Sequence, residues 1–89
     1  MLGWPGDDIN QKAGLAVDPE RALVYVTDPG NARVLVYRTD GTFVATWGER
    51  GTGANQFLSP TGIAVGPDGR VYVADGDAHR VLILPPAGE

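Results

Sequence analysis

The sequence predicts an all-β fold built from two copies of one antiparallel unit. The segment from Gly14 to Tyr37 returns as the segment from Gly62 to Leu84, with GLAVDP matched by GIAVGP and LVYVTD matched by RVYVAD. A repeat of about this length is one supersecondary unit that must stack on copies of itself to bury its faces. Within each copy, runs of strand length rich in Val, Leu and Tyr alternate with Gly, Pro, Asp and Asn, which is typical of short strands joined by turns.

The two copies align with a single insertion. Matching positions lie 48 residues apart as far as Pro19 and Pro67, and 47 apart after the extra residue Ala22. The identical pairs are Gly14/Gly62, Ala16/Ala64, Val17/Val65, Pro19/Pro67, Val24/Val71, Tyr25/Tyr72, Val26/Val73, Asp28/Asp75, Arg33/Arg80, Val34/Val81, Leu35/Leu82 and Gly41/Gly88.

The first copy contains four expected strands, at about 14–17, 23–27, 33–38 and 42–47, and the second contains three, at about 62–65, 70–74 and 80–84. Their turns have local causes. Pro29 fixes φ and Gly30 leaves it free, and the Asp-Gly pairs at 40–41 and 68–69 are signals of tight hairpins. Runs such as LVYV and IAV are apolar on both faces, which indicates strands covered on both sides. No window of helical length has an apolar period of 3.6 residues, so we expect no helix beyond a single turn.

The second copy carries the pattern P-x-G-I-A-V-x-P-D-G-x-V-Y-V-A-D…R-V between Pro60 and Val81, and this pattern resembles the NHL repeat. The first copy departs from it, because Lys12 and Ala13 replace an aromatic residue and a proline, and residues 20–22 replace Asp-Gly. The VYVTD wording is also similar to YVTN-type repeats, whereas the Gly-His and Trp-Asp signatures of WD40 repeats are missing. The resemblance implies a β-propeller, in which four antiparallel strands form a blade and blades surround an axis.

On this reading residues 1–89 form one two-bladed unit, with blade 1 at about 14–47 and blade 2 at about 62–89. Glu89 aligns with Thr42, where the fourth strand of blade 1 starts, so blade 2 lacks its fourth strand. The N-terminal residues align with the end of that strand, Trp4 falling on Trp47. We therefore expect the N-terminal strand of a neighbouring copy to complete blade 2; the alternative is an irregular segment before the first repeat. This closing strand consists of Met1, Leu2, Gly3 and Trp4.

Propellers usually have about 4–8 blades, so two blades need partners. Either the chain is an excerpt of a longer protein, or it assembles with copies of itself. NHL-like propellers are most often six-bladed, and the resemblance therefore favours a homotrimer, with an eight-bladed homotetramer as the competitor.

Composition limits the partners further. The net charge is −4 and there is no cysteine, so thiol and disulfide chemistry are excluded. Some NHL proteins bind RNA, but the basic residues here are scattered singly, and we expect no nucleic-acid partner. The sequence has no apolar stretch long enough to span a bilayer and no signal peptide, so we expect no membrane partner, and it gives no localisation. The basic residues are Lys12, Arg21, Arg33, Arg38, Arg50, Arg70 and Arg80.

Two charged positions occur in both copies. Asp28 and Asp75 end the second strand, and Arg33 and Arg80 begin the third. A repeated residue more often serves the repeat than a unique site. The carboxylate can accept N–H bonds of the turn, and the arginine can pair with it or cover the flank of the blade. The alternative is a ring of charges around a ligand.

The candidates for a ligand-binding face are Asn31, Arg50, Asp77 and His79. His79 is the only histidine, and with Asp77 alone it offers too few ligands for a metal site. The alternative is a site in which three-fold symmetry brings three His79 side chains together, which requires their loops to lean toward the axis. Some NHL-like propellers are metal-dependent lyases, but their several histidine ligands are not matched here. We therefore expect no metal and no cofactor.

The glycine-rich stretch 48–53 has no helix after it, so we interpret it as the connection between blades and not as a phosphate cradle. Trp47 and Phe57 flank it and are expected to pack between blades and not to form a ligand cage. No catalytic triad or carboxylate pair presents itself. The sequence thus favours a non-enzymatic, self-assembling propeller fragment. The alternatives are an excerpt of a larger propeller that binds protein, peptide or carbohydrate, and a metal-dependent lyase.

Overall fold

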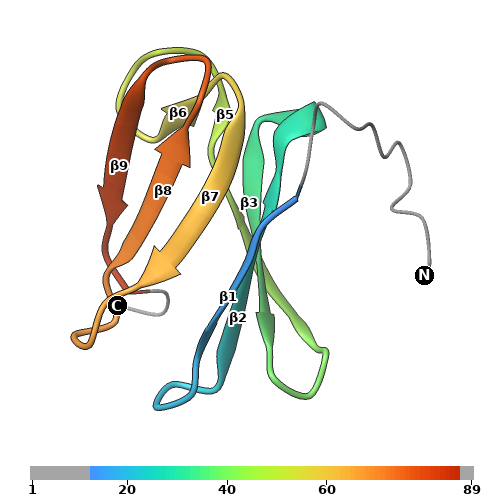
Figure 1. Cartoon of the computed structure of the whole chain (residues 1–89). Helices are drawn as coiled ribbons and strands as arrows, with labels where there is room; N and C mark the ends of the chain where they lie inside the picture. Colours follow the sequence, from blue (N-terminus) through green and yellow to red (C-terminus); the bar gives the residue numbers. More distant parts are fainter. Residues whose placement is uncertain (1–12, 87–89) are drawn as a thin grey trace.

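The computed structural model of the chain describes residues 13–86, which form two large antiparallel sheets and one small parallel pair (Figure 1). The first sheet, blade 1, contains β1 (Leu15–Asp18), β2 (Leu23–Asp28), β3 (Arg33–Arg38) and β4 (Phe43–Trp47), adjacent in sequence order. The second, blade 2, contains β7 (Pro60–Val65), β8 (Val71–Asp75) and β9 (Arg80–Leu84).

The predicted all-β class is confirmed for the described residues. Every strand expected from the sequence is present within two residues of its expected ends, and the one helical element between residues 13 and 86 is the 3₁₀ turn η1 (Pro29–Asn31). No helix in this part of the chain is long and apolar enough to cross a membrane. The proposed closing strand, residues 1–4, lies outside the described residues.

The connection between the blades is more ordered than the sequence indicated. β5 (Glu49–Arg50) and β6 (Gln56–Phe57) form a short parallel pair. The Gln56 side chain holds the loop between them, since its Oε1 accepts from the Gly53 N–H at 2.9 Å and its Nε2 donates to Glu49 Oε1 at 3.1 Å. Strands of two residues are too short to show an alternating pattern, so the sequence could not predict them.

The hydrophobic core lies between the two blades, which pack face to face (Figure 1). Tyr25 and Trp47 of blade 1 lie with ring centroids 5.4 Å apart, and Val71 and Val73 of blade 2 are fully buried. The buried cluster consists of Leu23, Tyr25, Ala32, Val34, Val36, Phe57, Val71, Val73 and Leu84, with Ala45, Trp47, Ile63, Val65 and Leu82 packed against it.

Candidate functional site

The four residues expected at a ligand-binding face are all exposed, and their loops lie at the same end of the two blades (Figure 1). Asn31 is in η1, Arg50 is in β5, and Asp77 and His79 are in the loop from β8 to β9. Arg50 already holds a neighbouring turn, because its Nη2 donates to the carbonyl oxygen of Gly30 at 3.1 Å.

His79 occupies a position that the turn constrains. Its φ is 55°, in the left-handed region that few non-glycine residues adopt, and its repeat equivalent Ala32 has a φ of 53°. The same backbone shape thus ends the turn in both blades, whichever side chain stands there. Among residues 13–86, no group of three or more His, Cys, Asp or Glu side chains could hold a metal ion.

Asp75 joins the segment before β7 to the turn after β8, at one end of blade 2. Its buried carboxylate accepts N–H bonds from Leu58 and Ser59, both at 2.8 Å, just before β7 starts, and a longer one from Ala78 at 3.4 Å in the following turn. Desolvation by burial acts to raise the pKa of Asp75, but these N–H donors and the charge of Arg80 together outweigh it and lower the pKa below the ordinary value of 3.8. The folded backbone around Asp75 therefore favours the ionised carboxylate.

Asp28 and Arg33, the equivalents of Asp75 and Arg80 in blade 1, have different hydrogen-bond partners. Asp28 accepts from the side chains of Asn31, at 3.0 Å, and Arg33, at 2.9 Å. Arg80 makes no such ion pair among the described residues; its Nη2 instead donates to the carbonyl oxygens of Gln56 at 2.8 Å and Gly53 at 3.1 Å, which anchors the blade connection. The repeated Asp and Arg positions thus have different contacts in the two blades, and all of these contacts lie within the chain.

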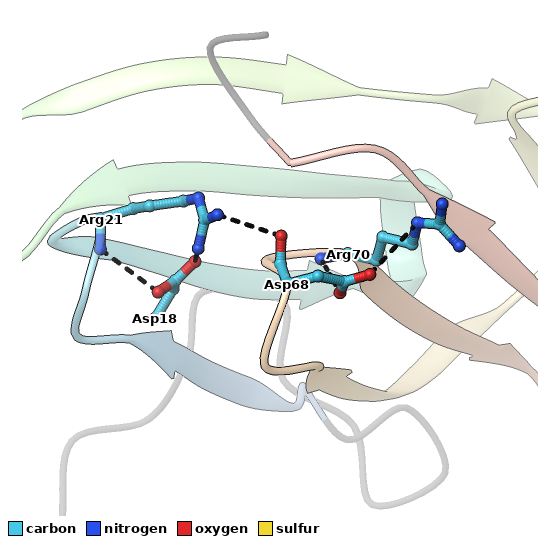
Figure 2. A network of polar contacts seen from close by, with 4 residues as sticks. All are labelled: Asp18, Arg21, Asp68 and Arg70. Carbon is cyan, nitrogen blue, oxygen red and sulfur yellow. Dashed lines mark hydrogen bonds and ion pairs between the residues drawn. The ribbon is translucent and has the colours of Figure 1, made fainter.

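A polar network that the sequence analysis missed links the blades at their opposite end (Figure 2). The guanidinium of Arg21 donates to Asp18 Oδ2 at 3.3 Å and, across the joint, to the carbonyl oxygen of Asp68 at 3.0 Å. It lies so close to Gly69 that a Cβ there would come within 2.5 Å of Arg21 Cζ. The only sequence signal was the departure from the repeat at residues 20–22.

We expect Arg21→Ala to lower the free energy of unfolding by about 1 kcal/mol, because the variant loses a cross-blade hydrogen bond and leaves the carboxylate of Asp18 buried without its cation. Arg70→Ala is the control, since Arg70 pairs with Asp68 on the surface, where both side chains are more than half exposed. Equal melting temperatures for the two variants would contradict the linking role of Arg21.

A second contact joins the innermost strands. The hydroxyl of Thr27, fully buried in β2, accepts from the Gly14 N–H at 2.6 Å and lies 3.1 Å from the carbonyl oxygen of Thr61, to which it donates. Gly14 leaves room for this approach, because a Cβ at residue 14 would lie 2.4 Å from the Thr61 oxygen. The joint between blades therefore brings two backbones together at this point.

The outer face of blade 2 is apolar and exposed. Tyr72, Val81 and Ile83 point away from blade 1, with 36%, 61% and 59% of their surface exposed. We call this set, with Ala64 and Ala74 beside it in register, the outer face of blade 2. Its three large residues are the repeat equivalents of buried core residues of blade 1: Tyr72 matches Tyr25, Val81 matches Val34, and Ile83 matches Val36.

Blade 1 also has an exposed apolar face, and most of its residues match residues of blade 2 that face the core. Leu15, Val17 and Phe43 are 63%, 47% and 55% exposed. We call these three residues, together with their register neighbours Val24 and Tyr37, the outer face of blade 1. Four of the five match residues of blade 2 that face the core, the pairs being Leu15/Ile63, Val17/Val65, Val24/Val71 and Tyr37/Leu84. Most residues of each exposed face thus have their repeat equivalent in one half of the joint inside the chain.

Comparison with known families finds a match to one half of the internal repeat. The NHL repeat family matches residues 57–84, which run from β6 to the end of β9 and so include all three strands of blade 2. That blade 1 is a second repeat remains a prediction from the internal alignment.

Proposed function

Residues 57–84 of this chain match the NHL repeat, and we propose that the chain is a self-assembling propeller fragment whose copies join head to tail in a closed ring, as a six-bladed homotrimer. One observation carries the proposal: its two exposed apolar faces are the repeat equivalents of the two faces that already bind each other inside the chain. The outer face of blade 2 in one copy would receive the outer face of blade 1 in the next.

The proposed contact is heterologous, because it joins two different surfaces. Such contacts continue from copy to copy and form a ring when the rotation closes. The faces are large enough to matter, since large exposed apolar side chains from two strands of each sheet, β1 and β4 in blade 1 and β8 and β9 in blade 2, would be removed from water. Six blades follow from the family resemblance, and an eight-bladed homotetramer would use the same contact.

The open edge of blade 2 supports a second part of the proposal, strand exchange. In blade 1, β4 covers β3 from Val34 to Tyr37. In blade 2, no fourth strand covers β9 within residues 13–86. An uncovered strand edge readily accepts an extended segment, and we propose that residues 1–4 of a neighbouring copy take this place. The proposal assigns the protein no catalytic step, metal or cofactor.

The test is the mass in solution. Light scattering on the intact chain is expected to give three copies of the 9.4 kDa subunit, and Ile83→Lys is expected to give single chains with an unchanged β-type circular dichroism spectrum, because a charge would be buried in each joint. Thr52→Lys adds the same charge in the loop between β5 and β6, outside both outer faces, and should leave the assembly intact.

A wild-type mass of one chain would refute self-assembly and favour a binding module within a larger propeller. A mass of four chains would keep the head-to-tail contact and replace the trimer. An Ile83→Lys protein that assembles like the wild type would show that the outer faces are not the joint.

A further inference from the structure

We infer that Gly62, on the outer face of blade 2, is the point at which the backbone of the next copy makes its closest approach, through the carbonyl oxygen of that copy's Ala13. The inference rests on the proposed head-to-tail assembly and names the contact that fixes how the two faces fit together. Two glycines at equivalent positions of the two blades, Gly14 and Gly62, provide the evidence.

Gly14 shows what this contact looks like inside the chain. A Cβ at residue 14 would lie 2.4 Å from the carbonyl oxygen of Thr61 in blade 2 and 3.5 Å from Cγ2 of Ile63. Its φ lies outside the left-handed region, so the backbone conformation would permit any residue. The glycine is therefore required by the neighbouring blade, whose carbonyl group occupies the space of a side chain.

Gly62 is the repeat equivalent of Gly14, but it is exposed and has no blade against it among the described residues. A Cβ at residue 62 would meet only the Cβ of Ala74, at 3.3 Å, and its φ also lies outside the left-handed region. Nothing between residues 13 and 86 requires this glycine as strongly as Thr61 requires Gly14. An approaching carbonyl group would require it.

The alignment identifies that carbonyl group. Thr61, which approaches Gly14, matches Ala13, which is exposed at the start of blade 1. When the outer face of blade 1 of one copy meets the outer face of blade 2 of another, the same geometry places the oxygen of Ala13 against Gly62. The occupant of this position is therefore a second copy of the chain.

One polar bond of the internal joint is missing from the joint between chains. Thr27 bridges the Gly14 N–H and the Thr61 oxygen, whereas its equivalent Ala74 has no hydroxyl group. We therefore expect the joint between chains to be weaker than the joint inside the chain. Ala74→Thr should restore the bridge to the oxygen of Ala13, and Ala74→Val supplies the same shape without the hydroxyl.

Sedimentation velocity over a dilution series of the full chain tests the inference. Gly62→Ala should raise the dissociation constant of the ring at least tenfold, because the added methyl group would overlap the incoming carbonyl oxygen. The melting temperature, measured at protein concentrations below the dissociation constant of the ring, should change little. The double variant Gly62→Ala/Ala74→Gly removes the 3.3 Å contact within the chain and should assemble as poorly. Ala74→Thr should lower the dissociation constant relative to Ala74→Val.

The outcomes separate this inference from the proposed function. If Gly62→Ala assembles like the wild type while Ile83→Lys gives single chains, the outer faces form the joint and the contact at Gly62 is wrong. If Ile83→Lys also leaves the mass unchanged, both proposals are wrong. If Ala74→Thr assembles no better than Ala74→Val, the carbonyl oxygen of Ala13 does not lie at this position.

Discussion

Phe57→Ala is expected to lower the free energy of unfolding by about 3–5 kcal/mol, the usual cost of truncating a buried aromatic side chain. Phe57 is fully buried in the cluster between the blades. Its ring also packs on Gly48, where a Cβ would lie 2.4 Å from Cε2 of the ring. A domain of this size typically has only about 5–15 kcal/mol in total, and a unit with two outer faces exposed should lie near the lower limit.

Chemical denaturation measures this loss, with Ile83→Lys as the background so that unfolding is not coupled to assembly. Phe43→Ala is the matched control, because Phe43 is the same residue type but stands half exposed on the outer face of blade 1. It should cost little in this background. Equal losses for the two variants would show that Phe57 is not part of the core between the blades.

The position of Phe57 also shows which features of the fold can be predicted from the sequence. Its placement between blades is expected from its position beside the glycine-rich stretch 48–53, which the sequence identifies as the connection between blades. Strand length, alternation and turn residues are likewise properties of neighbouring positions. For the same reason the strands of both blades could be located within two residues. The apolar residues on both faces of the inner strands even indicated that each blade needs a neighbour on either side.

Contacts between distant segments could not be predicted in this way. Asp28 and Asp75 are equivalent in the sequence, yet one accepts from two side chains and the other from backbone N–H groups that precede β7. Arg21 stands in an insertion that breaks the repeat, and its role depends on the carbonyl group of Asp68 in the other blade. Such roles depend on what folding brings near, and a repeat alignment does not contain that information.

The same difference between the two aspartates leads to an unequal effect of their removal. Asp75→Ala leaves the part-buried N–H groups of Leu58 and Ser59 without their acceptor, and we expect it to cost about 2–4 kcal/mol. Asp28→Ala frees the side chains of Asn31 and Arg33, which can turn toward water, and should cost about 1 kcal/mol. Denaturation of both variants in the Ile83→Lys background gives the comparison, and equal losses would contradict it.

Asp75→Asn tests the same carboxylate through the dependence of the free energy of unfolding on pH. The pKa of Asp75 is lower in the folded chain than its ordinary value of 3.8, so the folded state favours the ionised carboxylate. Its contribution to stability is therefore fully present above about pH 4 and is lost as the pH falls from there through the lower folded-state pKa. The asparagine cannot titrate, so the stability of the Asp75→Asn variant should fall less steeply below pH 4 than that of the protein that retains Asp75. Parallel curves for the two proteins in this range would show that the backbone donors around Asp75 do not hold its charge.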